Sequence, residues 1–247
     1  LSGADAAQTS KLLAMIAGMG PRKGIGVRLD GQPLSDFSAA ALRKSINFVP
    51  RHPALLPGTV LNNLTLFDSR YNQLARDYAE ALGLLPFLAR FRNGVLTEIG
   101  GLGTEQFDEG VYQRIALIRA LVREPRVLLL DEPFGALDEI TRADMQQLLL
   151  QLIAEHHTAA VLITHDIDEA LLLSERILLL GNSPAHILGE WRIDLPQPRA
   201  ELVEELGALR IDILKTLRRA SRNPLTQPVP ATSEIDHVPG RLHSHTS

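Results

Sequence analysis

Cysteine is absent from the 247 residues of this sequence, which excludes disulfide bonds and metal sites that depend on thiolate ligands. Aromatic residues account for only 4% of the chain, which argues against a surface on which nucleic-acid bases stack. Positive charge is also scarce, because 29 Asp and Glu residues outnumber 25 Lys and Arg residues and the net charge is −4. We therefore expect no nucleic-acid partner.

Long apolar runs are missing as well. No run approaches the roughly 20 residues that a membrane-spanning helix needs, and the first residues do not resemble a secretory signal peptide. Both absences favour a cytosolic protein. Hydrophobic residues nevertheless make up 45% of the chain, which is enough to build a folded core.

The most informative stretch is RVLLLDEPFGALD, residues 126–138. Its first five residues, 126–130, contain four consecutive apolar side chains, a run typical of a central parallel strand that is buried on both faces. Asp131 and Glu132 follow at the carboxyl end of this predicted strand, where ligands bind in open α/β sheets. Two adjacent carboxylates there suit a hard cation and a polarised water. The alternative for an isolated pair is an acidic strand end that caps the next helix.

The first eighteen residues predict a glycine-bearing loop followed by a buried helix. This geometry suits phosphate, because backbone N–H groups converge at a helix N-terminus. Gly3 and Ser10 match the phosphate-loop pattern G-x-x-x-x-G-K-[ST], whereas Gln8 and Thr9 stand in place of its second glycine and its lysine. Lys11 comes two positions late, which turns it about 200° around the helix axis. An ordinary helix capped by Thr9 or Ser10 is the alternative.

The rest of the chain alternates short apolar segments with amphipathic ones. Strands are predicted at residues 46–49, 159–163, 176–180 and, as a final pair, within 185–193, and residues 24–31 are predicted to form a short strand with a turn. Helices are predicted at residues 9–17, 39–44, 71–82, 86–92, 112–122, 141–156, 168–173 and 201–219, with a loop over 58–66. This alternation predicts an α/β fold with a mostly parallel sheet flanked by helices.

Two further segments contain candidate site residues. His165 follows the predicted strand after the central one, and its imidazole reaches the same cleft if the two strands are neighbours. A lone histidine in such a position is otherwise structural or on the surface. A glycine-rich stretch, residues 94–110, leads into a helix and also suits an anion. Asp108 and Glu109 oppose that use, because like charges repel.

Taken together, these residues resemble the nucleotide-binding domain of an ABC transporter. RVLLLDEP is similar to its Walker B strand, FGALD to its D-loop and ITHD to its switch region. The resemblance implies ATP and Mg²⁺ as cofactors, with Asp131 and Ser10 at the metal. It also implies that Glu132 orients the attacking water and that His165 senses the γ-phosphate. Asp138 would lie at the contact with a second nucleotide-binding domain.

The phosphate loop departs from the family pattern. By the resemblance, Gly3, Gln8, Thr9 and Ser10 belong to the nucleotide site, but the lysine and the second glycine of the loop are missing. Loss of the lysine removes a charge-assisted phosphate contact worth roughly 1.5–3 kcal/mol, or about one to two decades of affinity. We therefore expect weak nucleotide binding.

The signature and the Q-loop depart from the pattern too. The family signature L-S-G-G-Q reads FDEGV here, so Gly110 is retained while Asp108 replaces the serine that would contact the partner's nucleotide. A carboxylate facing a triphosphate is unfavourable. Arg51 stands at the position of the Q-loop glutamine. The contribution of this chain to a partner's site is therefore expected to be impaired as well.

The resemblance implies a P-loop NTPase-like fold with an inserted helical subdomain. The predicted parts are an ATP-binding core (1–68 and 126–195), a helical subdomain with the signature-like loop (69–125), a C-terminal helix (196–222) and a disordered tail (223–247). The first strands of the core and the aromatic residue that stacks on adenine would precede Leu1, so we expect them to be missing.

The predicted function is that of an ATP-binding subunit of an ABC transporter with weak or impaired ATPase activity. Its partners would be membrane permease subunits and a second nucleotide-binding domain, at the cytoplasmic face of the membrane. The alternatives are a catalytically inactive interaction or regulatory module and a truncated gene product. LDGQPLSD is similar to exporter sequences and EPFGALDEITR to importer sequences, so the sequence leaves the direction of transport and the solute open.

Overall fold

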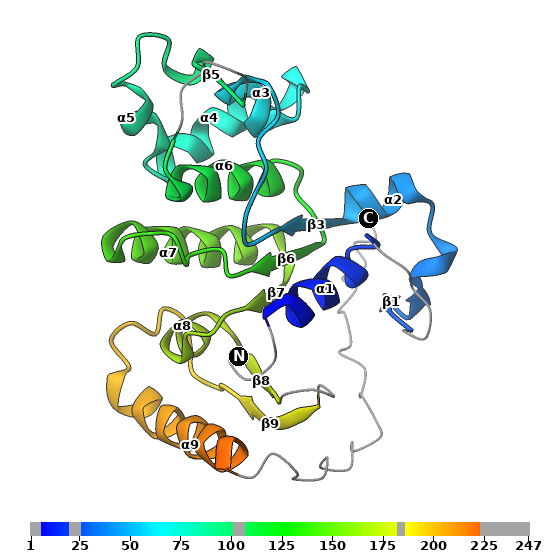
Figure 1. Cartoon of the computed structure of the whole chain (residues 1–247), viewed down its shortest axis with the longest axis vertical. Helices are drawn as coiled ribbons and strands as arrows, with labels where there is room; N and C mark the ends of the chain where they lie inside the picture. Colours follow the sequence, from blue (N-terminus) through cyan, green and yellow to red (C-terminus); the bar gives the residue numbers. More distant parts are fainter. Residues whose placement is uncertain (1–5, 20–25, 101–106, 182–185, 223–247) are drawn as a thin grey trace, which may run out of the picture.

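The computed structural model describes residues 6–19, 26–100, 107–181 and 186–222. The helices are α1 (Ala6–Ile16), α2 (Ala39–Ser45), α3 (Val60–Thr65), α4 (Asn72–Ala81), α5 (Leu84–Leu88), α6 (Glu109–Leu121), α7 (Glu139–His156), α8 (Ile167–Leu173) and α9 (Val203–Arg222). The strands are β1 (Arg28–Leu29), β2 (Gln32–Pro33), β3 (Ile46–Val49), β4 (Gly58–Thr59), β5 (Glu98–Ile99), β6 (Val127–Asp131), β7 (Ala159–Ile163), β8 (Arg176–Leu180) and β9 (Ile187–Arg192). Figure 1 shows α3 to α5 at one end of the molecule, β3, β6 and β7 in the middle, and α8 and α9 at the other end.

The central sheet contains β3, β6 and β7 in that order, and its strands are parallel. The leucines of β6 alternate between two hydrophobic cores. Leu128 and Leu130 pack into the core that includes α6 and α7, while Leu129 packs on the opposite face with Leu13 of α1 and Leu42 of α2. Burial on both faces explains why β6 is a continuous apolar run, and the predicted central strand is confirmed.

Strand β7 lies beside β6, as predicted, but it is not the buried strand that the sequence suggested. It occupies an edge of the three-stranded sheet, and Ala159, Ala160 and Val161 are exposed. Only its second half is covered, because Leu162 and Ile163 pack against the cores on the two faces of β6. An apolar run does not by itself distinguish a central strand from an edge strand.

The α/β fold class is confirmed, with corrections to two further predicted segments. Residues 58–66 form β4 and α3 rather than the predicted loop. The Thr59 hydroxyl caps α3 by accepting a hydrogen bond from the N–H of Asn62 at 3.0 Å, and Val60 and Leu64 are fully buried. A six-residue helix is too short to show the 3.6-residue period. The predicted pair of strands within 185–193 is a single strand, β9, antiparallel to β8.

Helices α3 to α6 pack on one another around a hydrophobic core, to which α6 contributes Ile115 and Ile118. The same core continues into β6 and α7. The side chain of Asn47 in β3 also donates a hydrogen bond to the carbonyl of Ala120 in α6 at 2.7 Å. Because one core crosses the predicted limits of the helical subdomain, those limits stay predictions.

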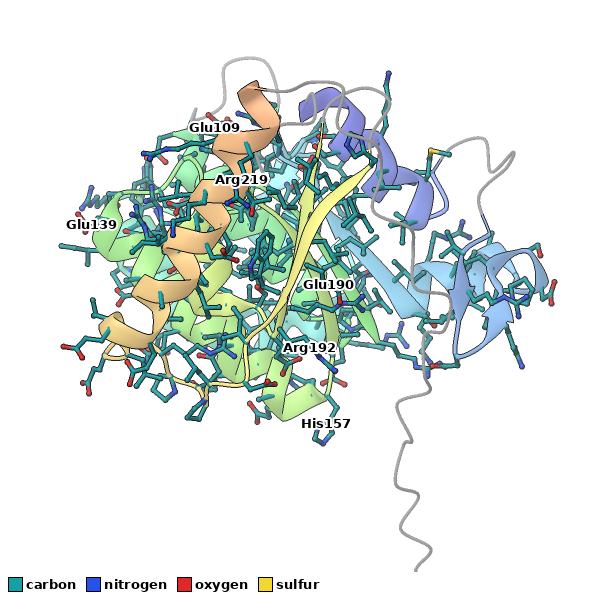
Figure 2. The ribbon with its side chains drawn as sticks, turned by 90° about the horizontal axis from the view of Figure 1, so that it is seen from below. Glu109, Glu139, His157, Glu190, Arg192 and Arg219 are labelled. Atoms are coloured by element: carbon teal, nitrogen blue, oxygen red, sulfur yellow. The ribbon has the colours of Figure 1, made fainter. Side chains whose placement is uncertain are left out.

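The C-terminal part of the described chain packs on the β8–β9 hairpin. Figure 2, seen from below, shows α9 (orange) beside these strands (yellow), and α9 contacts β9. Ile213 of α9 is fully buried, and the indole N–H of Trp191 in β9 donates to Asp212 at 2.8 Å. The helix predicted at 201–219 is thereby confirmed as α9, whereas the predicted disordered tail, 223–247, lies outside the described residues. Among the described helices, none combines the length and the apolar character that crossing a membrane requires.

Candidate functional site

Ser10 and Asp131 meet where α1 packs against the end of β6. The Ser10 hydroxyl donates a hydrogen bond to Oδ2 of Asp131 at 2.5 Å, across 121 positions of sequence. Asp131 is the last residue of β6 and is only 3% exposed. The structure therefore brings together the two residues that the sequence predicted as metal ligands.

Glu132 follows immediately and is held in an unusual backbone conformation. Its φ of +46° lies in the left-handed region, which is uncommon for a residue with a side chain. Its N–H donates to the carbonyl of Ile163 at 2.9 Å, so β7 fixes the turn after β6. Such backbone strain often accompanies functional sites. Here it directs a carboxylate whose side chain is only 11% exposed.

Both carboxylate oxygens of Glu132 face nitrogen atoms of basic side chains. Oε1 lies 3.3 Å from Nδ1 of His165, and Oε2 lies 3.2 Å from a guanidinium nitrogen of Arg51. The prediction that His165 reaches the cleft of the two acidic residues is confirmed. The Arg51 contact was missed, although Arg51 follows β3, which lies beside β6. Because parallel strands end at the same edge of a sheet, the strand order was the signal that would have revealed the contact.

The predicted phosphate loop is described only in part. Gly3 lies outside the described residues, and Gln8 is within α1. Thr9 is buried, and Lys11 is exposed on the same helix. Helix α1 begins at Ala6, so neither Thr9 nor Ser10 caps it and that alternative was wrong. Thr9, which stands where the family pattern has its lysine, is therefore a buried residue inside the helix.

Asp108 is the N-cap of α6, and Gly110 lies in the first turn of this helix. The side chain of Asp108 accepts a hydrogen bond from the N–H of Val111 at 2.9 Å, which starts the helix three residues earlier than predicted. Gly110 is buried, and a Cβ there would lie 3.1 Å from Leu137 and 3.2 Å from the carbonyl of Ala136. Asp108 thus bonds within its own helix, whereas Ser10 bonds Asp131 at the end of β6.

Asp138 caps the next helix, α7. Its carboxylate accepts hydrogen bonds from the N–H and the hydroxyl of Thr141, at 3.0 and 2.7 Å. These bonds hold the pKa of the Asp138 carboxyl below its ordinary value. The local role of Asp138 is therefore to fix the turn after Glu132, and its predicted contact with a second domain stays a prediction.

The donor atoms at this strand end suit Mg²⁺. Ser10 and Asp131 offer a hydroxyl and a carboxylate already in contact, and Mg²⁺ prefers oxygen ligands from one or two carboxylates, with phosphates and water completing its shell. Within the described ranges no group of three or more His, Asp or Glu side chains forms a self-sufficient metal site. Ser10 and Asp131 therefore fit a metal ion whose remaining ligands come from a bound phosphate group and water.

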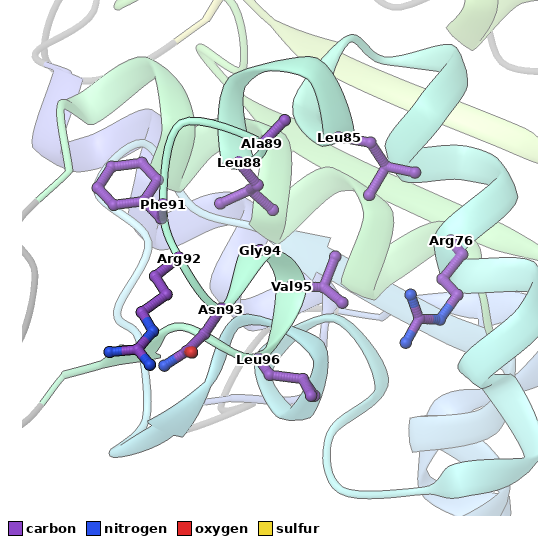
Figure 3. A pocket seen from close by; sticks show the side chains of 10 residues that line it. All are labelled: Arg76, Leu85, Leu88, Ala89, Phe91, Arg92, Asn93, Gly94, Val95 and Leu96. Carbon is purple, nitrogen blue, oxygen red and sulfur yellow. The ribbon is translucent and has the colours of Figure 1, made fainter.

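A hollow of about 470 Å³ lies elsewhere, in the helical region (Figure 3). Arg76 and Arg92 stand at opposite ends of it in this view. Its other lining residues are Leu85, Leu88, Ala89, Phe91, Asn93, Gly94, Val95 and Leu96. None of them is a predicted site residue, so the hollow is separate from the site at the end of β6.

Comparison with known proteins identifies the family. The family model described as "ABC transporter" matches residues 3–135. The chain belongs to the ABC transporter family. The matched range includes Ser10, Asp131 and Glu132, and the prediction of an ABC transporter nucleotide-binding domain is confirmed.

Curated relatives within the ABC transporter family extend the similarity beyond residue 135. The chain is 37% identical over 227 residues to "Aliphatic sulfonates import ATP-binding protein SsuB 1" of Xanthomonas axonopodis pv. citri, covering 88% of this chain and 84% of that protein. It is 34% identical over 216 residues to "Aliphatic sulfonates import ATP-binding protein SsuB 2" of Pseudomonas syringae pv. tomato, covering 86% and 89%.

A solved ABC structure shares the fold. The structure of a bacterial Atm1-family ABC exporter with ATP bound matches with a TM-score of 0.68 at 23% sequence identity. The match covers 89% of this chain and 36% of the exporter chain. At this identity the likeness supports the predicted P-loop NTPase-like α/β fold, and the direction of transport is a separate question.

Proposed function

We propose that this chain binds ATP together with Mg²⁺ and serves as the ATP-binding subunit of an ABC importer. The hydrogen bond between Ser10 and Asp131 carries the proposal, because it joins the end of β6 to the helix of the phosphate-loop-like segment. A hydroxyl and a carboxylate placed this way are the protein's share of a magnesium–phosphate site. Bound there, the ion would neutralise phosphate charge and polarise the terminal phosphate.

Glu132 is the residue proposed to orient the attacking water and to accept its proton on a carboxylate oxygen. Its side chain emerges directly after the metal-holding Asp131 and is largely shielded from solvent. His165, at the neighbouring strand end, is proposed to keep the carboxylate oriented and to respond to the terminal phosphate, which its 3.3 Å contact with Glu132 supports. Arg51 occupies Oε2 of this carboxylate at 3.2 Å, where a water would otherwise donate, which is one reason to expect slow hydrolysis.

The phosphate loop gives a second reason for weak activity. Thr9 stands at the position of the phosphate-binding lysine, and Gln8 at that of the second glycine. The loss of one charge-assisted contact lowers ATP affinity by about one to two decades. Asp108, at the serine position of the signature, would further weaken a site shared with a second nucleotide-binding domain.

The proposed partners are membrane permease subunits and a second nucleotide-binding domain, with Asp138 near the contact between the two domains. The relatives that match over most of their length are named as sulfonate import ATP-binding proteins, which favours import and a peripheral place on the cytoplasmic side of the membrane. The permease would determine which solute is carried.

Titration with a fluorescent ATP analogue in the presence of Mg²⁺ tests the proposal. The wild-type chain should bind, and Glu132→Gln should still bind while losing any measurable hydrolysis. Asp30→Asn is the matched control, because Asp30 is an exposed carboxylate that forms an ion pair with Arg126. Absence of binding up to millimolar ATP would overturn the proposal and favour a cassette that acts as an interaction module.

A further inference from the structure

Arg51 is a basic residue at the edge of the sheet where the candidate site lies. Its guanidinium is 3.2 Å from Oε2 of Glu132, and its side chain is 42% exposed whereas that of Glu132 is 11% exposed. One partner of this ion pair is therefore fixed and shielded, and the other borders solvent. A guanidinium in this situation can exchange one anionic partner for another at little cost, because water screens the pair on its side.

The backbone of Arg51 is anchored, whereas its side chain is partly exposed and is held by the ion pair with Glu132. The side chain of Gln113 in α6 donates a hydrogen bond to the carbonyl of Arg51 at 2.5 Å. The adjacent His52 lies 2.7 Å from a carboxylate oxygen of Glu109, also in α6. These contacts hold the segment after β3 against α6, so a turn of the Arg51 side chain does not require the segment to move.

The charge of the site requires a cation that α1 does not supply. Asp131 and Glu132 repel a nucleoside triphosphate, and a single Mg²⁺ does not balance both carboxylates and the phosphates. On α1 the lysine position of the phosphate loop is the buried Thr9, and Lys11 is exposed two residues later. Arg51 and His165 are the basic side chains that contact Glu132 in the described structure.

We propose that Arg51 is a phosphate-binding residue that pairs with Glu132 in the nucleotide-free chain and transfers to the terminal phosphate of a nucleoside triphosphate. This inference rests on the proposed function, since it assumes that nucleotide binds at the end of β6. The planar guanidinium matches a phosphate group through two parallel hydrogen bonds, which suits it to replace a lysine. Its departure frees Oε2 of Glu132 to accept a proton from water.

The test is to compare ATP and ADP affinities of wild type and Arg51→Gln by equilibrium titration with Mg²⁺. Loss of the contact to the terminal phosphate should weaken ATP binding about tenfold and ADP binding less than twofold. Arg51→Lys should recover part of the loss. Arg176→Gln is the control, because Arg176 forms a similar exposed ion pair with Glu190 on the β8–β9 hairpin and should leave both affinities unchanged.

The outcomes separate this inference from the proposed function. If wild type binds neither nucleotide, the proposed function fails. If wild type binds ATP and Arg51→Gln binds it equally well, or loses ATP and ADP affinity to the same extent, Arg51 is not a ligand of the terminal phosphate and the inference is overturned.

A second variant covers the case in which Arg51→Gln fails to fold. Glu132→Gln removes the competing carboxylate, so Arg51 becomes fully available to phosphate. A non-hydrolysable ATP analogue should then bind several-fold more tightly to Glu132→Gln than to wild type, while ADP affinity stays nearly constant. An equal gain for both nucleotides would contradict the transfer of Arg51 to the terminal phosphate.

Discussion

Gly110 and Leu137 approach each other so closely that a Cβ added to Gly110 would lie 3.1 Å from a methyl carbon of Leu137. The first turn of α6 therefore packs directly on the loop between β6 and α7. The carbonyl of Ala136 and the carboxylate of Asp108, each 3.2 Å from the same Cβ position, leave little room for adjustment. Gly110 thus has a packing role whether or not it contacts a nucleotide.

Gly110→Ala should destabilise the protein by about 1 kcal/mol, because overpacking outweighs the helix propensity that alanine gains. Gly207→Ala is the matched control, since Gly207 lies in α9 and a Cβ there meets nothing within 4 Å. The control should stabilise by about 0.5–1 kcal/mol. Urea denaturation measures both, and equal stabilisation by the two substitutions would contradict the packing role.

Asn63 holds the segment before α3 in place. Its side-chain oxygen accepts hydrogen bonds from the N–H of Leu56 and from Arg119, and its amide donates to the carbonyls of Leu56 and Thr59. Asn63→Ala leaves several of these buried groups unpaired and should cost about 2–3 kcal/mol of unfolding free energy. The neighbouring Asn62→Ala serves as the control in the same thermal or urea assay. A loss no greater than that of the control would show that water replaces these bonds.

Glu169 is a buried carboxyl in α8, where desolvation raises its pKa above the ordinary value of 4.5 despite hydrogen bonds from Thr164 and Gln146. The folded state therefore binds a proton more tightly than the unfolded state does, so stability falls as pH rises from about 4.5 through the raised pKa. Glu169→Gln should remove this decline and be more stable than wild type at neutral pH. Denaturation curves from pH 4 to 8 measure the difference, and parallel pH profiles would contradict a raised pKa.

The central strand and its acidic end were predictable because they depend on local pattern. Four consecutive apolar residues, followed by Asp131 and Glu132, indicate a buried strand whatever the rest of the fold is. The link between Ser10 and Asp131 was implied by the resemblance to a family in which a phosphate loop and a Walker B strand occur together, and the structure brings these distant segments into contact.

Other features depend on the arrangement of elements in space, which local pattern does not contain. The edge position of β7 follows from the order of the three strands, and so does the meeting of Arg51 with Glu132. The tight contact of Gly110 with Leu137 requires the packing of α6 on the loop after β6. Helix α3 was missed because it spans only Val60–Thr65 and its cap and burial define it better than its periodicity.

The most direct test of the account is a double-mutant cycle on Ser10 and Asp131, measured as ATP affinity with and without Mg²⁺. Ser10→Ala and Asp131→Asn should each weaken binding about tenfold in Mg²⁺. The double variant should lose less than the product of the two effects, because both residues act on the same ion. Without Mg²⁺, neither single variant nor the double variant should bind more weakly than wild type. Affinity that does not depend on Mg²⁺, or losses that persist when the ion is removed, would contradict a magnesium–nucleotide site at the end of β6.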